Sequence, residues 1–113
     1  MNAFRSTVES LALQPGVRGA VIAAPDGVII ESVVHSDVRA DALAAFGSAV
    51  LARARAVAAA TSLTRLRCIA IDAQAGRLYL ASNNEVAIVV LAEARTSIGR
   101  LRIALRHALE SLA

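Results

Sequence analysis

The sequence predicts a single α+β domain in which one antiparallel sheet carries helices on both faces. Helical periodicity occurs at both ends and in the middle of the chain, β-branched runs lie between these helices, and turn residues separate the runs. The predicted order is αββαβββα over residues 1–113, without a linker or repeat. Hairpins on either side of a long helix favour a five-stranded antiparallel sheet with the second helix on one face and the first and third helices on the other.

The first half of the chain contains a short helix, a hairpin and a long helix. Its predicted elements are a helix at 3–13, strands at 17–24 and 28–34, and a helix at 38–62. Pro15-Gly16 ends the first helix. Pro25-Asp26-Gly27 predicts a tight turn between the strands, because proline presets φ, aspartate bonds its own backbone and glycine accepts positive φ.

The second half contains three strands and a closing helix. Its predicted elements are strands at 66–72, 77–82 and 85–92, and a helix at 96–112. Ala75-Gly76 and Asn83-Asn84 mark the turns, since glycine and asparagine tolerate left-handed conformations. Residues 86–91 are apolar at every position, which predicts an interior strand covered above and below.

Two apolar stripes run along the helix predicted at 38–62. The first has large side chains and is expected to be the buried face: Leu43, Phe46, Val50 and Val57. The second is made of alanine: Ala45, Ala49, Ala52, Ala56 and Ala59. A face of small residues lets another backbone approach closely. Because a chain of 113 residues has little else to cover that face, the alanine stripe predicts an oligomer.

Composition limits the classes of partner. The net charge is only +3, all 12 Lys and Arg residues are arginine, and acidic residues are interspersed among them. Three aromatic residues are too few for a stacking platform on single-stranded nucleic acid. The uncharged apolar stretches are far shorter than the roughly 20 residues of a membrane span, and no signal peptide is visible. We therefore expect a cytoplasmic protein with no nucleic-acid partner and no membrane span.

The sequence contains no recognisable catalytic constellation. It lacks a phosphate-binding glycine loop, a paired-histidine metal motif and a nucleophile elbow. His35 and His107 are isolated, and the lone Cys68 excludes an internal disulfide and is expected to be a small buried thiol. We expect a protein that is not an enzyme and that uses no cofactor and no metal.

Four segments together resemble the Roadblock/LC7 superfamily, which includes MglB-like bacterial proteins. They are LQPGVRGAV at 13–21, APDGVII at 24–30, VAIVVL at 86–91 and IGRLR at 98–102. The resemblance covers nearly the whole chain and implies a Roadblock/LC7, profilin-like domain that forms a homodimer. It also implies that the third strand pairs with its twin and that the second helices pack together. Residues 61–64 depart from the family by lacking its glycine-rich link.

The resemblance further implies a non-catalytic regulator or adaptor of a Ras-like small GTPase. The dimer interface would contain Ala45, Ala49, Ala52, Ala56, Ala59, Leu66, Cys68 and Ala70. An exposed edge strand at 66–72 fits this expectation, because such edges are normally paired or blunted. The charged residues nearest the dimer centre, and thus the candidates for binding the GTPase, are Arg39, Arg53 and Arg55.

Two other functions stay open. The protein could be a dimeric scaffold without effect on nucleotide turnover, which a neighbouring gene for a Ras-like GTPase would disfavour. It could also be a small-molecule sensor, because PAS-like and profilin-like domains share this layered shape. The sensor hypothesis is weakened because no convergent polar residues are evident for a core pocket.

Overall fold

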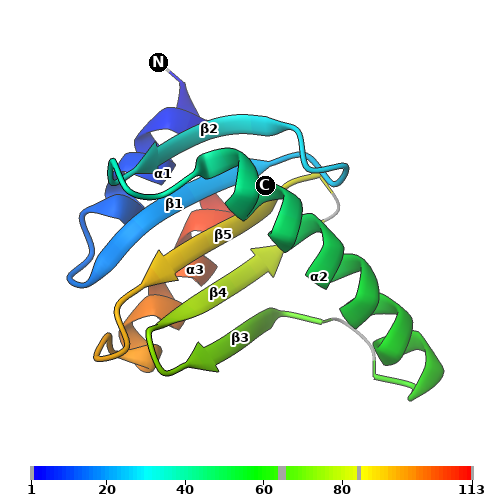
Figure 1. The fold of residues 1–113 in the computed structure, drawn as a ribbon. Helices are drawn as coiled ribbons and strands as arrows, with labels where there is room; N and C mark the ends of the chain where they lie inside the picture. The colour runs from blue at the N-terminus through cyan, green and yellow to red at the C-terminus, as the bar shows by residue number, and fades with distance from the viewer. Residues whose placement is uncertain (1, 64–65, 84, 113) are drawn as a thin grey trace.

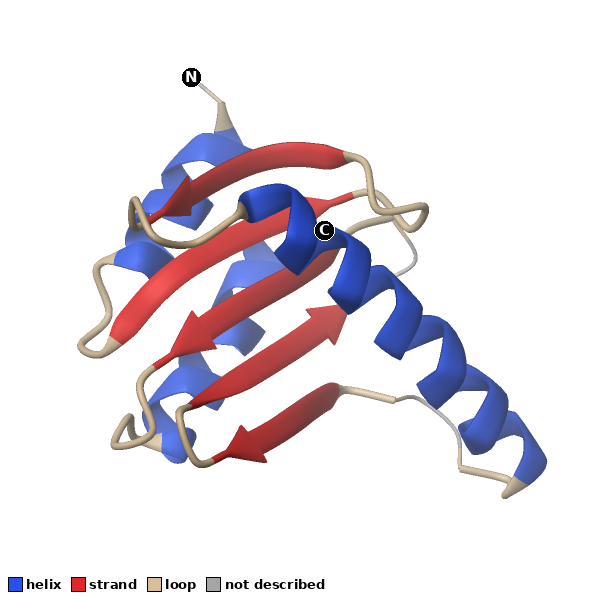
Figure 2. Cartoon of the chain, viewed as in Figure 1, coloured by secondary structure: helices blue, strands red, loops and turns tan. Residues whose placement is uncertain are grey.

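In the computed structural model, which describes residues 2–63, 66–83 and 85–112, five strands form one antiparallel sheet (Figures 1 and 2). The strand order is β2-β1-β5-β4-β3. The elements are α1 (Ala3–Ala12), β1 (Val17–Ala23), β2 (Ile29–Val34), α2 (Ala40–Ala60), β3 (Cys68–Ala73), β4 (Gly76–Ser82), β5 (Ala87–Ala92) and α3 (Ile98–Ser111). This order confirms the predicted αββαβββα arrangement, and each boundary lies within two residues of its prediction.

The helices occupy the two faces of the sheet as predicted. Val8 of α1 and Leu101 and Leu105 of α3 pack in one apolar cluster with the side chains of β1, β4 and β5 that point to their side. Leu43 and Leu51 of α2 pack in a second cluster with the side chains that point the other way. This division follows from the alternation of side chains along a strand.

Strand β5 is the middle of the sheet and confirms the interior strand expected from its apolar sequence. It pairs with β1 on one side and β4 on the other, and its residues Ile88, Val89 and Val90 are at most 1% exposed. Within the described residues, β2 and β3 are the two edges of the sheet.

The turns form for the local reasons that predicted them. Gly27 has a φ of +91°, and the Asp26 carboxylate accepts a hydrogen bond from the backbone N–H of Val28 at 3.1 Å. The Asn83 side chain accepts hydrogen bonds from the backbone N–H groups of Glu85 and Val86, both at 2.8 Å. Thr64 and Asn84 lie outside the described residues. The expectations for the 61–64 link and for the Asn83-Asn84 turn rest partly on them.

The rotation of α2 about its axis differs from the prediction. Phe46 and Val57, expected in the buried stripe with Leu43 and Val50, are 50% and 60% exposed. The buried face is made mainly of small residues: Leu43, Ala44, Gly47, Leu51 and Ala58.

Gly47 explains this rotation. A Cβ atom on Gly47 would lie 2.4 Å from Val89 Cγ2, far inside van der Waals contact. The helix therefore lies close to the sheet along its small-residue side. The close approach predicted for α2 concerned the alanine stripe and a second copy; within the chain, close approach occurs at Gly47, which was not predicted.

Candidate interaction surface

An open apolar groove runs beside α2 on the side that faces β3. Helix α2 packs against β1, β2 and β5, and its C-terminal half extends beyond the sheet (Figure 1). The groove has a volume of about 510 Å³. We call it the α2 groove and define it by the apolar residues Phe46, Ala49, Val50, Val57, Leu63 and Leu66.

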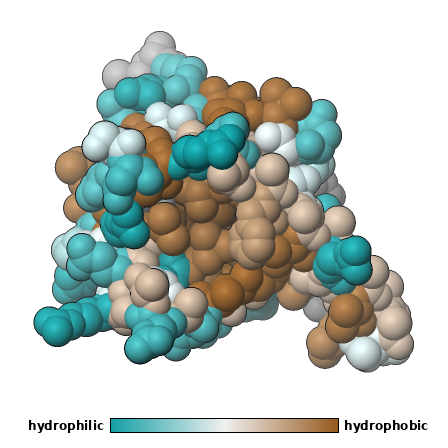
Figure 3. All heavy atoms as spheres, viewed as in Figure 1, coloured by the Kyte–Doolittle hydropathy of each residue, from teal (hydrophilic) through white to brown (hydrophobic). Residues whose placement is uncertain are grey.

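The α2 groove is the main exposed apolar surface beside this helix. Leu63 is 65% exposed and Leu66 is 37% exposed, in addition to the half-exposed Phe46 and Val57. Viewed from the side of α2, apolar side chains gather along the helix and over the neighbouring sheet face (Figure 3). Single exposed apolar residues are ordinary, but a contiguous patch of this kind marks an interaction site.

Helix α2 is also long and apolar enough to cross a membrane by length and composition. Its 21 residues have a mean hydropathy of 1.4 in the most apolar window, of which 22% is buried. The prediction of no membrane span rested on uncharged stretches alone and did not consider this helix, which contains two arginines. However, α2 is packed on the sheet through Gly47 and carries Arg53 and Arg55 in its second half. Its exposed apolar face therefore suits a protein partner better than lipid.

Strand β3 adds an unpaired backbone edge next to the α2 groove. Within the described residues it pairs with β4 alone, from Cys68 opposite Ala81 to Ala73 opposite Gly76. Its outer N–H and C=O groups are therefore available to another strand. Leu66 lies two residues before this strand and also lines the α2 groove, so the apolar surface and the backbone edge are continuous.

The three predicted interface residues near β3 lie at this edge in different surroundings. Leu66 is exposed beside the α2 groove, Cys68 is half-buried on the α3 side of the sheet, and Ala70 is exposed. Ile69 and Ile71, which alternate with Cys68 and Ala70 along β3, turn to the α2 side and pack against its apolar cluster.

The alanine stripe is exposed along its whole length. Its members are Ala45, Ala49, Ala52, Ala56 and Ala59. By helical periodicity they point largely away from the face buried on the sheet, and Ala49 also lines the α2 groove. No other part of the described chain covers the stripe, as the interface prediction requires.

The three candidate arginines do not form one cluster within the chain. Arg39 precedes α2 and pairs with Asp41 at 2.8 Å, and this hydrogen bond lowers the pKa of Asp41 below its ordinary value. Arg53 lines the α2 groove. Arg55 donates a hydrogen bond to Ser82 Oγ at 3.0 Å. With a rise of 1.5 Å per residue, Arg39 lies about 20 Å along the helix from Arg53.

The exposure of Phe46, Val57 and Leu63 was missed from the sequence, although a signal was present. Arg53 follows Phe46 by seven residues and precedes Val57 by four, so all three share one side of α2. A charge within a stripe of large apolar residues indicates that the stripe is not core. Leu63 follows the helix, where periodicity gives no information.

The geometry also limits the chemistry that the described residues offer. Among them, no three His, Cys, Asp or Glu side chains come together as a potential metal site. His35 lies in the connection before α2, His107 lies on α3, and both are exposed. The principal feature of the described surface on this side is therefore an apolar groove beside an open strand edge.

Comparison with known proteins shows where this architecture occurs. A family model described as the Roadblock/LC7 domain matches residues 4–92. An uncharacterised protein of Methanocaldococcus jannaschii is 28% identical over 97 residues, which cover 86% of this chain and 85% of that protein. MglB of Myxococcus xanthus has the same fold, with a TM-score of 0.89, 18% identity and coverage of 99% of this chain and 93% of that one.

A Roadblock/LC7 domain from Streptomyces avermitilis gives a TM-score of 0.87 at 17% identity, covering 95% of this chain and 92% of that one. These structural likenesses establish the fold. The family model spans all five strands and the helices α1 and α2. The protein with the α2 groove and the open β3 edge is thus a member of the Roadblock/LC7 family.

Proposed function

We propose that the protein is a homodimeric, non-catalytic regulator or adaptor of a Ras-like small GTPase. The observation that carries the dimer is the continuity of the α2 groove with the unpaired edge of β3, because Leu66 belongs to the groove and leads into the strand. The regulatory role is supported by membership of the Roadblock/LC7 family and by what the sequence resemblance implies about its members.

A two-fold axis beside β3 would satisfy both features at once. Antiparallel pairing of β3 with its twin would supply partners for the exposed backbone groups and extend the sheet across two chains. The same axis would bring the α2 groove of one copy toward that of the other. Since a two-fold interface uses each surface twice, Phe46 and Val57 of both copies would be removed from water. The alanine stripe would then flank this interface.

Val57→Glu tests the dimer directly. The substitution places a carboxylate in the centre of the groove of each copy, and desolvation and like-charge repulsion should weaken the dimer by several kcal/mol. Ile103→Glu is the matched control, because Ile103 is a 56% exposed apolar residue on α3, away from the groove. Light scattering over a concentration series should give a dimeric wild type, a dimeric Ile103→Glu variant and a monomeric Val57→Glu variant.

Ala52→Glu tests the alanine stripe in the same assay. If the stripe flanks the interface, this variant also loses affinity. A monomeric wild type, or a Val57→Glu variant as dimeric as the control, would contradict the proposed dimer. If Val57→Glu separates the chains and Ala52→Glu does not, the groove and β3 edge form the interface without the stripe.

The GTPase role is tested with the Ras-like protein encoded nearest to this gene. The protein alone should not hydrolyse GTP, and at saturation it should change the single-turnover rate of that GTPase. Arg53→Ala and Arg55→Ala should weaken the complex and reduce its salt dependence without lowering thermal stability, because both side chains are exposed in the single chain. Because Arg53 also lines the α2 groove, light scattering should show that Arg53→Ala remains dimeric. If the GTPase binds but its rate of hydrolysis is unchanged, the protein has a scaffold role. If the GTPase does not bind, both the regulatory and the scaffold roles are refuted.

A further inference from the structure

A second cavity lies on the opposite face of the sheet, between α3 and the β3 edge. Its volume is about 500 Å³, within the usual range for small-molecule sites. The small side chains of Cys68 and Ala81, which are opposite each other in the β3–β4 register, form part of its lining. Leu105 and Leu109 of α3 contribute an apolar wall.

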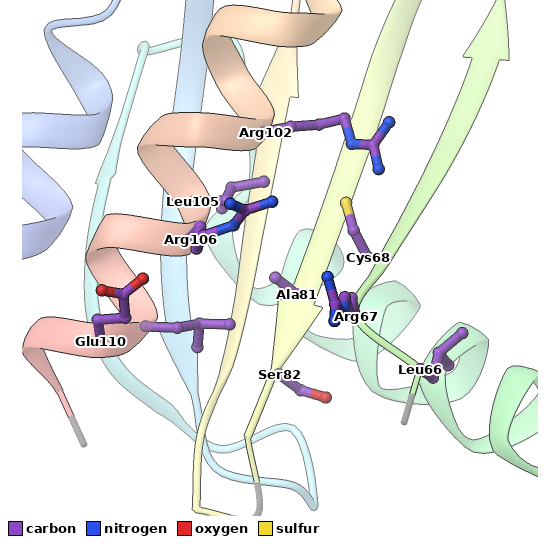
Figure 4. A pocket seen from close by; sticks show the side chains of 10 residues that line it. Leu66, Arg67, Cys68, Ala81, Ser82, Arg102, Leu105, Arg106 and Glu110 are labelled. Atoms are coloured by element: carbon purple, nitrogen blue, oxygen red, sulfur yellow. The ribbon is translucent and has the colours of Figure 1, made fainter. Parts of the chain in front are cut away.

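Three arginines surround this cavity. Arg102 and Arg106 lie one turn apart on α3, and Arg67 immediately precedes β3. In Figure 4 the side chains of Arg102 and Arg106 extend from the helix toward β3, where Arg67 lies. Positive side chains from α3 and from the segment before β3 therefore lie around one cavity.

These arginines form no ion pair with an acidic side chain in the described part of the chain. None of the ion pairs found there includes Arg67, Arg102 or Arg106. Glu110 is the acidic residue in the lining, but the guanidinium of Arg106 points away from it (Figure 4). Like charges one helical turn apart repel, so this arrangement would be stabilised by a bound anion.

The positive charge of Arg102 also acts on the Cys68 thiol in the lining of the cavity. Burial raises the pKa of Cys68 above its ordinary value, and the charge of Arg102 acts in the opposite direction. Arg102 is therefore close enough to affect a half-buried group of this cavity, although it is itself an exposed residue.

We propose that this cavity binds a small phosphorylated molecule that carries an apolar group. Guanidinium groups bind phosphate oxygens through paired, charge-assisted hydrogen bonds, and Leu105 and Leu109 would contact the apolar part. A nucleic acid fits less well, because the arginines gather around a hollow and the nearby aromatic residue, Tyr79, is 1% exposed and offers no stacking surface.

The proposed ligand site goes beyond the GTPase role, because it lies on the face of the sheet opposite α2. It shares Leu66 and Cys68 with the predicted dimer interface at the β3 edge. The site also supplies the convergent polar groups that the sequence did not indicate for a sensor. Arg67 and Arg102 are 35 positions apart in the chain, and only the packing of α3 on β4, the neighbour of β3, brings them to one cavity.

Calorimetric titration of the protein with phenyl phosphate and with inorganic phosphate tests the proposal. Phenyl phosphate should bind, and inorganic phosphate should bind more weakly because it cannot use the apolar wall. Arg102→Ala and Arg67→Ala, on opposite sides of the cavity, should each weaken phenyl phosphate binding by about tenfold or more. Bound phenyl phosphate should also slow alkylation of Cys68, and circular dichroism should show both variants folded.

Arg100→Ala is the matched control. Arg100 is an exposed arginine on the same helix but outside this cavity, so its loss removes the same net charge and should leave the affinity within about twofold. Equal losses in Arg100→Ala and Arg102→Ala would overturn the proposal, because they would show diffuse charge attraction. Absence of phenyl phosphate binding would overturn it, as would preferential binding of a single-stranded oligonucleotide that depends on Arg67 and Arg102.

Discussion

Substituting alanine for Gly47 tests the packing that sets the rotation of α2. Two effects oppose each other at this position. Alanine favours a helix interior over glycine by about 1 kcal/mol. However, the new Cβ would lie 2.4 Å from Val89 Cγ2 and 3.3 Å from Leu80 Cδ2, and both of these side chains are at most 1% exposed.

The steric effect should dominate. Ordinary carbon contacts begin near 3.5 Å, so α2 or Val89 must move by about 1 Å. Val89 has restricted rotamers because it is β-branched, and overpacking a closed core typically costs about 1–3 kcal/mol. After subtracting the helix-propensity gain, we expect Gly47→Ala to lower the free energy of unfolding by about 1 kcal/mol.

Gly99→Ala is the control with the opposite sign. Gly99 lies in the first turn of α3, and a Cβ there would have no neighbour within 4 Å. Only the propensity gain applies, so we expect stabilisation by about 0.5 kcal/mol. Thermal unfolding at one fixed protein concentration should separate the two variants by about 6 °C, since 1 kcal/mol corresponds to about 4 °C for a domain of this length.

A Gly47→Ala variant as stable as Gly99→Ala would refute the reasoning. It would mean that α2 does not lie against Val89 at this distance. The exposure of Phe46 and Val57, which follows from the same rotation, would then be in doubt, and with it the α2 groove.

The remaining predictions concern two other positions. Cys68 should react with a maleimide more slowly near neutral pH than a cysteine in the unfolded chain, because its raised pKa leaves less thiolate. Arg102→Ala should shift the rate–pH profile of Cys68 to still higher pH, because it removes the positive charge that favours the thiolate. Gly16→Ala should lower the free energy of unfolding by about 1–3 kcal/mol in urea, because Gly16 has a φ of +85° and its Cβ would collide with Thr96 Oγ1.

The elements and turns could be predicted because their causes are local. The Pro25-Asp26-Gly27 turn forms through the backbone conformation of Gly27 and a hydrogen bond that spans two residues. The apolar run in β5 needs cover on both faces wherever it lies, so its central place in the sheet followed from its composition. The edge position of β3 followed from the order of the elements and the family resemblance.

The side of α2 that packs on the sheet could not be predicted by choosing the larger side chains. A glycine buries almost no area of its own, but it permits the closest approach, and that approach decides which neighbours are covered. Arg53 was the local indication, because a charge among Phe46 and Val57 is incompatible with a buried face. Its exposure on the actual helix agrees with that indication.

The sequence by itself determined the order of helices and strands, the layering of the domain and its membership of the Roadblock/LC7 family, because periodicity, turn chemistry and motif order are properties of neighbouring residues. Only the tertiary structure decided which apolar side chains stay exposed and which arginines share a cavity. Gly47 lies against Val89, and Arg67 and Arg102 line one cavity, because segments that are 35 or more positions apart in the chain pack together. Such contacts depend on the distances between packed elements, which no local pattern encodes.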